Sequence, residues 1–219
     1  MFKLYITVII SFLMLSLNAS AEESEKNESK KINLDIYGYF GYTSMSLQDK
    51  DINGESPNLT GSNLTVGGLY TIQTNTKIKP VVGLALQGTY VTGDYKNDVG
   101  DKWKVRYNYS AILANAGIKY NINEKFNFIG LGSLGTTTRD EYEYERPIGY
   151  PGNLFTTTDI SNHYIYSVNL MGLYKFGDLF SMGANATLGM HTMEQKFRKE
   201  SKDLTYFEKS INLLFMWSI

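Results

Sequence analysis

Residues 164–190 read YIYSVNLMGLYKFGDLFSMGANATLGM, and this stretch decides the fold. Apolar side chains occupy every second position on both sides of the Gly177-Asp178 pair. Polar or small residues fill the positions between them, as at Asn169 and Asn185. This period of two predicts two β-strands, each with one apolar and one polar face, joined by a tight turn.

The same alternation recurs along the chain from Ile32 to the last residue. It gives eight runs, which cover about 32–43, 64–73, 80–91, 112–121, 126–135, 163–176, 180–190 and 207–219. Each run has the length that a tilted strand needs to cross a bilayer. We therefore predict an all-β chain folded as an eight-stranded antiparallel up-and-down barrel.

The connections between these runs alternate in length. The second, fourth and sixth are short, at about 74–77, 121–125 and 177–178. The other four are long, at about 45–63, 93–104, 139–160 and 194–205. Outer-membrane barrels have short periplasmic turns and long extracellular loops, and their sheet must close because lipid cannot pair with backbone groups. The pattern therefore predicts a transmembrane barrel of a Gram-negative-type outer membrane.

The two faces of the runs differ in chemistry, which predicts their orientation. Polar residues such as Gln87, Asn115 and Asn212 would be costly in hydrocarbon, so we expect them to fill a packed polar interior. Apolar residues then face lipid, with aromatic side chains gathered near both strand ends as two belts. Three charged inward residues near the short-turn end, Asp35, Lys119 and Lys175, predict a buried ion-pair cluster.

The N-terminus resembles an export signal. Residues 1–21 combine Lys3, an apolar run and an Ala-x-Ala site, which is typical of a cleaved signal peptide. Residues 22–31 contain no apolar side chain and predict a disordered polar leader, so the barrel domain spans 32–219.

Composition excludes several other classes of protein. The chain has no Cys, only two His, and 21 Lys and Arg against 22 Asp and Glu. These counts argue against disulfide scaffolds, thiolate or His-rich metal centres, and nucleic-acid binding by bulk charge. We expect no cofactor and no metal.

The export signal, the eight runs and an amphipathic last strand together resemble the superfamily of small eight-stranded outer-membrane β-barrels. This superfamily includes the Ail-, OmpX- and opacity-like adhesin barrels and the transmembrane domain of OmpA. Members end in a strand that the barrel-assembly machinery recognises by alternate apolar residues. Ile211, Leu213, Phe215 and Trp217 match that pattern, although the final residue is Ile219 and not an aromatic one. The resemblance implies a structural or surface-interaction role, with host interaction or adhesion as the sharper expectation.

The long connections are where we expect partners to bind, because packing and lipid occupy the wall. Tyrosines there could offer contact surface, and cations could pair with lipopolysaccharide phosphates or with a host or environmental ligand. The candidate residues are Arg139, Tyr142, Tyr144, Arg146, Tyr150, Lys196, Arg198 and Lys199.

Three alternatives remain open at this point. A lipid A-modifying enzyme is disfavoured because neither His163 nor His191 stands in a His-x-Ser motif, so we expect no enzyme and a hydrogen-bonded rim histidine at 163. A small pore is disfavoured by bulky inward residues such as Tyr37 and Tyr39. A soluble lipocalin-like ligand carrier would invert the two faces, which period alone does not decide.

Overall fold

The computed structural model describes residues 33–48, 57–96, 102–145, 155–197 and 200–219. The predicted signal peptide and polar leader lie outside these residues and stay predictions. No helix long and apolar enough to span a membrane is found in the described ranges.

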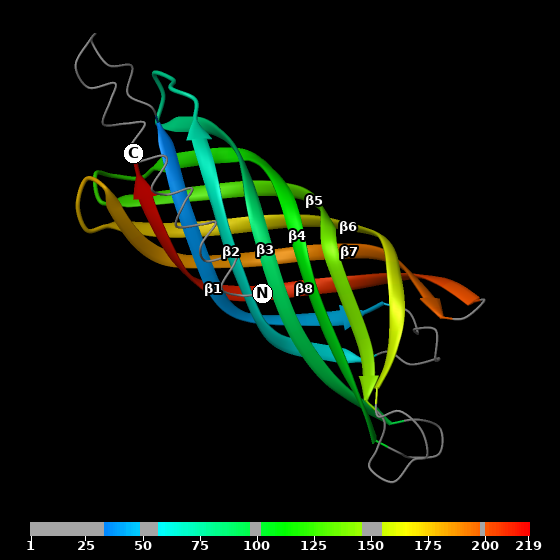
Figure 1. Ribbon diagram of the computed structural model, residues 1–219. Coiled ribbons are helices and arrows are strands. Elements are labelled where there is room, and N and C mark those ends of the chain that lie inside the picture. Colours follow the sequence, from blue (N-terminus) through cyan, green and yellow to red (C-terminus); the bar gives the residue numbers. More distant parts are fainter. Residues whose placement is uncertain (1–32, 49–56, 97–101, 146–154, 198–199) are drawn as a thin grey trace, which may run out of the picture. The chain divides into compact units, whose positions relative to one another are not determined.

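Eight strands make up the structure, as the sequence predicts (Figure 1). They are β1 (Leu34–Leu47), β2 (Asn58–Thr71), β3 (Ile78–Lys96), β4 (Lys102–Asn121), β5 (Phe126–Glu145), β6 (Phe155–Lys175), β7 (Phe180–Phe197) and β8 (Glu200–Ser218). Each strand pairs antiparallel with its neighbours in the sequence, and β8 pairs with β1 to close the barrel. The prediction of an all-β, eight-stranded, up-and-down barrel is confirmed.

The register tilts the strands steeply. Ser44 of β1 is opposite Lys209 of β8, and a row of partners followed from there through β7, β6, β5, β4, β3 and β2 returns to β1 at Leu34. The row therefore arrives ten residues from its start, between positions 44 and 34. Such a stagger corresponds to a strand tilt of about 40°. One circuit around the barrel therefore shifts the strand pairing by ten residues.

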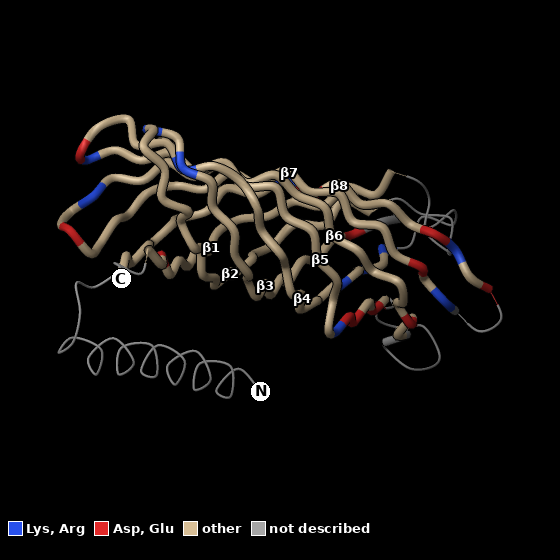
Figure 2. Tube along the Cα trace, turned by 90° about the horizontal axis from the view of Figure 1, so that it is seen from above, with Lys and Arg blue, Asp and Glu red and all other residues tan. Residues whose placement is uncertain are grey.

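The outer wall is apolar and carries two aromatic belts. Near the short turns the belt contains exposed Tyr70, Phe126 and Trp217, and toward the other end it contains Tyr90 and Tyr164. Lys, Arg, Asp and Glu gather at the two ends of the barrel, with few charges between (Figure 2). An apolar band between aromatic belts is the surface that faces lipid in outer-membrane barrels. The predicted lipid-facing side of each strand is confirmed, and the inverted, lipocalin-like arrangement is not found.

The interior is packed, but it is less polar than predicted. Asparagine, threonine and serine side chains fill the middle of the lumen, including buried Asn115, Asn169 and Asn185. An apolar layer lies between these side chains and the short turns. It contains Leu69, Val81, Ile129, Leu131, Met171, Leu173, Leu214 and Met216. A second apolar layer fills the opposite end. A lumen this narrow excludes bulk water, so apolar side chains fill it without a solvation cost.

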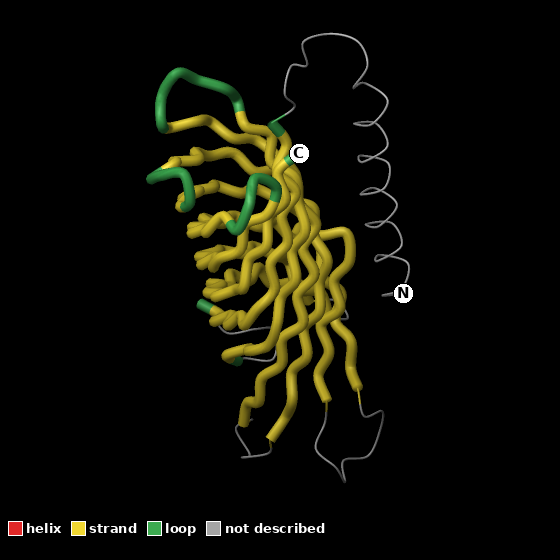
Figure 3. The backbone as a smooth tube through the Cα atoms, turned by 90° about the vertical axis from the view of Figure 1, so that its left-hand side faces the viewer, coloured by secondary structure: helices red, strands yellow, loops and turns green. Residues whose placement is uncertain are grey.

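The connections differ from the prediction at one end of the barrel. The short turns at 72–77, 122–125 and 176–179 agree with it, and Figure 3 shows them at one end. Most of the expected long loop at 139–160 is strand, because β5 continues to Glu145 and β6 begins at Phe155. The expected loop at 194–205 is wrong, since β7 and β8 pair as far as Phe197 and Glu200. Beyond the lipid, outward side chains face water and become charged, which hides the strand period in the sequence.

The predicted ion pair at the short-turn end is confirmed for two of its three members. Lys119 Nζ lies 2.6 Å from Asp35 Oδ2, and Ser218 Oγ donates a 2.5 Å hydrogen bond to Asp35 Oδ1. Asp35 is buried. Lys175 lines the same small cavity at the mouth of the barrel, but among the described residues it has no ion pair with Asp35.

Candidate functional site

The strands continue past the second aromatic belt and form what we call the outer extension, residues 43–47, 58–61, 91–96, 102–109, 137–145, 155–163, 191–197 and 200–206. Its lumen is lined mainly by apolar and tyrosine side chains, with buried polar exceptions that include Thr158, His163, His191 and Gln195. The buried apolar and tyrosine side chains are Met45, Leu47, Leu59, Val91, Val105, Tyr107, Tyr109, Tyr142, Tyr144, Met193, Leu204 and Tyr206. A core of this kind stabilises a sheet that no longer has lipid around it.

The tyrosines of the outer extension are in ring contact with one another and form hydrogen bonds. The rings of Tyr107 and Tyr142 have centroids 5.3 Å apart, and those of Tyr142 and Tyr144 are also 5.3 Å apart. The hydroxyls of Tyr142 and Tyr206 lie 2.9 Å apart, and Gln195 Nε2 donates to Tyr144 Oη at 3.1 Å. The lumen therefore offers aromatic faces together with a few hydroxyl partners.

The wall is interrupted between β5 and β6 at the base of the outer extension. Paired residues run up to Thr136 and Tyr164 and resume only at Tyr142 and Thr158. Residues 137–141 and 159–163 are not paired with each other across this interval. Asn162 within it has a φ of 51°, a left-handed conformation that Asn tolerates better than most residues. At this point side chains, and not backbone hydrogen bonds, hold the two strands together.

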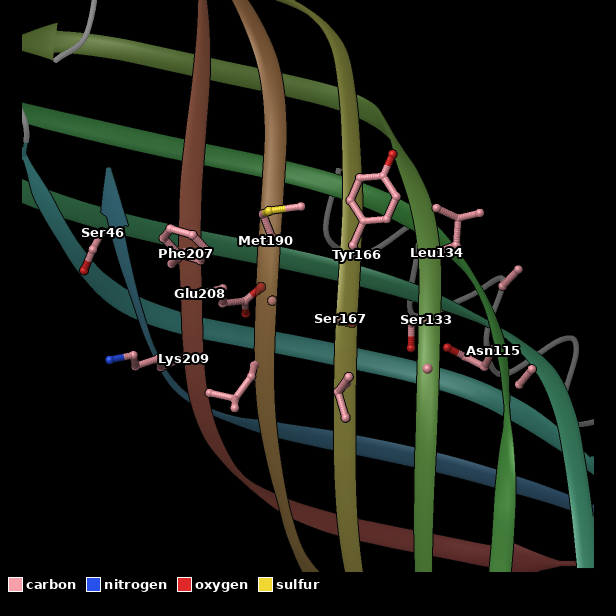
Figure 4. A pocket seen from close by; sticks show the side chains of 16 residues that line it. Ser46, Asn115, Ser133, Leu134, Tyr166, Ser167, Met190, Phe207, Glu208 and Lys209 are labelled. Carbon is pink, nitrogen blue, oxygen red and sulfur yellow. The ribbon is translucent and has the colours of Figure 1, made fainter. Parts of the chain in front are cut away.

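An apolar recess of about 930 Å³ lies in the wall over β4 to β8, next to this interruption (Figure 4). Leu134, Tyr166, Met190 and Phe207 form a row across β5, β6, β7 and β8 and are exposed on the outer surface. Small residues such as Gly132 open space beneath this row. The recess therefore presents an apolar surface at the edge of the lipid-facing band that adjoins the outer extension.

Two of the predicted partner-binding residues are not on the surface. Tyr142 and Tyr144 lie in β5 with their side chains buried in the lumen, so the prediction that they offer exposed loop surface is wrong. The sequence Asp140-Glu-Tyr-Glu-Tyr-Glu145 in fact alternates with a period of two. That alternation was the signal for a strand, with the glutamates in water and the tyrosines inside.

The other predicted partner-binding residues divide into two groups. Arg139 and Lys196 lie on β5 and β7 with exposed side chains, and each pairs with a nearby acid, Glu141 and Glu194 respectively. Arg146, Tyr150, Arg198 and Lys199 lie outside the described residues. Binding of a partner by any of them stays a prediction.

Glu194 connects β6, β7 and β8 near the end of the barrel that lies away from the short turns. Its carboxylate accepts hydrogen bonds from Ser161 Oγ of β6 at 2.9 Å and Ser201 Oγ of β8 at 2.7 Å, and it contacts Lys196 Nζ at 3.1 Å. The hydrogen bond from Ser201, followed by those from Lys196 and Ser161, lowers the Glu194 pKa to about 2. Glu194 therefore remains ionised over the whole physiological range.

Both histidines lie inside the lumen. His163 is buried and hydrogen-bonded, as expected of that residue, but its partners are Asp140, Tyr107 and His191 and not its sequence neighbours. Ser161 turns instead toward Glu194. Sequence reasoning missed Tyr107, Tyr109 and Tyr206, although the period of two in residues 102–121 and 200–218 extends to them. The expectation that the protein is not an enzyme stays a prediction.

Comparison with solved structures finds other barrels. The Ail attachment invasion locus protein of Yersinia pestis, solved with the heparin analogue sucrose octasulfate, is 12% identical, with 84% of this chain and 99% of that chain covered and a TM-score of 0.42. OmpT, an outer-membrane protease of Escherichia coli, is 7% identical over 90% and 100%, with a TM-score of 0.49. OprG of Pseudomonas aeruginosa is 12% identical over 89% and 99%, with a TM-score of 0.43.

Comparison with curated protein sequences finds no match. A family model described as the putative MetA-pathway of phenol degradation matches residues 15–202, which is most of the chain. The protein is thus a small eight-stranded outer-membrane β-barrel, and it belongs to the family described as the putative MetA-pathway of phenol degradation.

Proposed function

We propose that the protein admits small hydrophobic aromatic compounds of the phenol class into the outer membrane. The observation that carries this proposal is the lumen of the outer extension, which is lined mainly by aliphatic and tyrosine side chains although it lies beyond the lipid-facing band. The family description, with its reference to phenol degradation, points to the same class of compound.

The chemistry of the lumen suits a phenol. Phenol is the head group of tyrosine itself, so it can replace a neighbouring tyrosine in the same ring contacts and hydroxyl hydrogen bonds. The hydroxyl pair of Tyr142 and Tyr206 and the amide of Gln195 are polar groups of the kind that orient such a ligand in an otherwise apolar site. Entry requires these side chains to move, because they are buried against one another.

The route continues sideways and not down the barrel axis. Toward the middle of the barrel the lumen is filled by polar side chains such as Asn169 and Gln87. An apolar solute that passed between them would break their hydrogen bonds without replacing them. The unpaired interval between β5 and β6 lies at the level where the apolar layer ends, and the wall recess follows outside it. An apolar solute therefore gains most by leaving through this interval into lipid.

The proposal is tested by uptake into cells of a heterologous Gram-negative host with and without the protein. We expect labelled 4-tert-butylphenol to enter several-fold faster with the protein, whereas arabinose, a polar solute of similar size, enters at an unchanged rate. Equal phenol uptake in both strains would refute the proposal, and faster arabinose uptake would indicate a hydrophilic pore. The structural and adhesin-like roles expected from the sequence stay predictions.

A further inference from the structure

Four side chains from four consecutive strands form a continuous network across the lumen. His163, His191 and Glu208 are buried, and Asp140 is largely buried. His163 Nδ1 of β6 lies 2.9 Å from Asp140 Oδ1 of β5, and His163 Nε2 lies 3.0 Å from His191 Nδ1 of β7. His191 Nε2 lies 2.8 Å from Glu208 Oε2 of β8. Both imidazoles are fully shielded from solvent. Every ring nitrogen of the two histidines therefore has a partner within hydrogen-bond distance.

The Tyr107 hydroxyl lies 2.7 Å from Asp140 Oδ1 and 3.0 Å from His163 Nδ1, and we assign its proton to the shorter contact. The three contacts within the network then fix its number of protons. In each contact the lone pairs of the two atoms would face each other and repel unless one proton lies between them. Three contacts hold three protons, whereas two neutral imidazoles bring only two. With both carboxylates ionised, the histidine pair therefore carries one additional proton and one positive charge. This count is the same whichever nitrogen holds each proton.

The surroundings act on this charge in two directions. Burial lowers the pKa of His163 and outweighs the opposing effect of Asp140 and Glu208. Asp140 also accepts a hydrogen bond from Tyr107 Oη at 2.7 Å, and Glu208 accepts one from Thr43 Oγ1 at 3.1 Å. Among the ion pairs of the described residues, none joins Asp140 or Glu208 to Lys or Arg. Among the described residues, the titratable side chains next to the four are tyrosines. The rings of Tyr107 and Tyr109 of β4 contact the imidazoles, and Tyr39 of β1 lies near Glu208. Two carboxylates thus face the histidine pair, and no Lys or Arg within the described ranges forms an ion pair with either of them.

The network of Asp140, His163, His191 and Glu208 crosses the interrupted part of the wall. Asp140 lies within the unpaired interval of β5, and His163 lies within that of β6. Their contact, together with a 2.9 Å hydrogen bond from Thr136 Oγ1 to the His163 carbonyl, joins strands that lack backbone pairing there. His191 and Glu208 continue the connection to β7 and β8, which are paired throughout.

We propose that Asp140, His163, His191 and Glu208 form a proton-binding latch, in which one proton shared by the two imidazoles closes the wall between β5 and β6. A proton taken from solvent occupies the space between His163 Nε2 and His191 Nδ1. When that proton leaves, two lone pairs face each other at 3.0 Å and the contact breaks. His163 is then no longer held against β7, and the unpaired interval loosens. This inference does not rest on the proposed function.

The test uses the fact that the chain contains only two histidines. Protein labelled with ¹⁵N in its imidazoles and folded in lipid nanodiscs is measured by NMR from pH about 4 to about 9, because burial lowers the pKa of His163 below the usual histidine range. We expect a scalar coupling between two ring nitrogens at low pH and its loss, with release of one proton, at high pH. Two neutral imidazoles without coupling over the whole range would overturn the proposal.

A second measurement follows the wall itself. Hydrogen exchange of the backbone at 137–141, corrected for the intrinsic effect of pH, should accelerate about tenfold between the two ends of the range. The paired segment 81–91 of β3 should remain unchanged. In H163Q and H191Q the pH dependence at 137–141 should disappear. If exchange there is independent of pH in the wild type, or if both variants retain the wild-type dependence, the latch is refuted.

Discussion

At the scale of single residues, glycines set how closely neighbouring strands can approach. A Cβ at Gly183 would collide with the carbonyl oxygen of Gly172 on the neighbouring strand, whereas a Cβ at Gly172 would meet no atom within 4 Å. We expect Gly183→Ala to destabilise the barrel by about 2 kcal/mol, as overpacking does. Gly172→Ala should be neutral or slightly stabilising. Urea unfolding in lipid vesicles measures both, and equal effects of the two changes would contradict this account.

The buried pair of Asp35 and Lys119 gives a second prediction at this scale. Asp35→Asn leaves the largely buried Lys119 ammonium without its counter-ion, so we expect a loss of about 3 kcal/mol. Removing both charges, with Asp35→Asn and Lys119→Met together, should restore much of that loss because no unpaired charge remains. The same unfolding experiment measures this double-mutant cycle. A double variant as unstable as the single one would show that the ion pair is not the cause.

At the scale of elements, Glu194 joins β6, β7 and β8 at the end of the barrel that lies away from the short turns. Its pKa is lowered to about 2 in the folded protein, so its contribution to stability is present above its ordinary pKa and is lost as the pH falls toward 2. We expect hydrogen exchange at 159–162 and 200–203 to accelerate over this acidic range. In Glu194→Gln the exchange should be faster at neutral pH and should respond less to acid. Unchanged exchange in that variant would remove Glu194 from this role.

The same elements show how far the sequence predicts the structure. Where lipid faces the strand, apolar and polar residues alternate clearly, and the strands, their order and their outward faces follow from the period. Beyond the lipid, outward positions become charged, as at Glu141 and Glu143, and the strand reads as a loop. The inward side of the tyrosines follows from the period of two, as at Tyr142 and Tyr144. The contacts among the tyrosines and between the two histidines could not be predicted, because they depend on register between strands far apart in sequence. His163 and Asp140 meet only because β5 and β6 are staggered.

At the scale of the whole molecule, the filled lumen predicts that the barrel conducts no ions. The tyrosine and aliphatic side chains of the outer extension block one end, and the apolar layer near Leu173 and Met216 blocks the other. An ion would have to shed its hydration in both layers, at a cost of several kcal/mol or more. Protein reconstituted in planar bilayers should therefore show no stable conductance steps.

A variant tests whether the packing itself causes this closure. Tyr142→Ala with Tyr206→Ala removes two large rings and their shared hydroxyl contact from the outer layer, yet leaves the apolar layer near the short turns intact. Because two barriers act in series, this variant should still not conduct ions. Adding Leu173→Ala and Met216→Ala opens the second layer, and only then do we expect brief, small conductance events. Folding of each variant is checked by the faster gel migration of unboiled barrels. Conductance after the first pair of changes alone would place the whole barrier in the tyrosine layer.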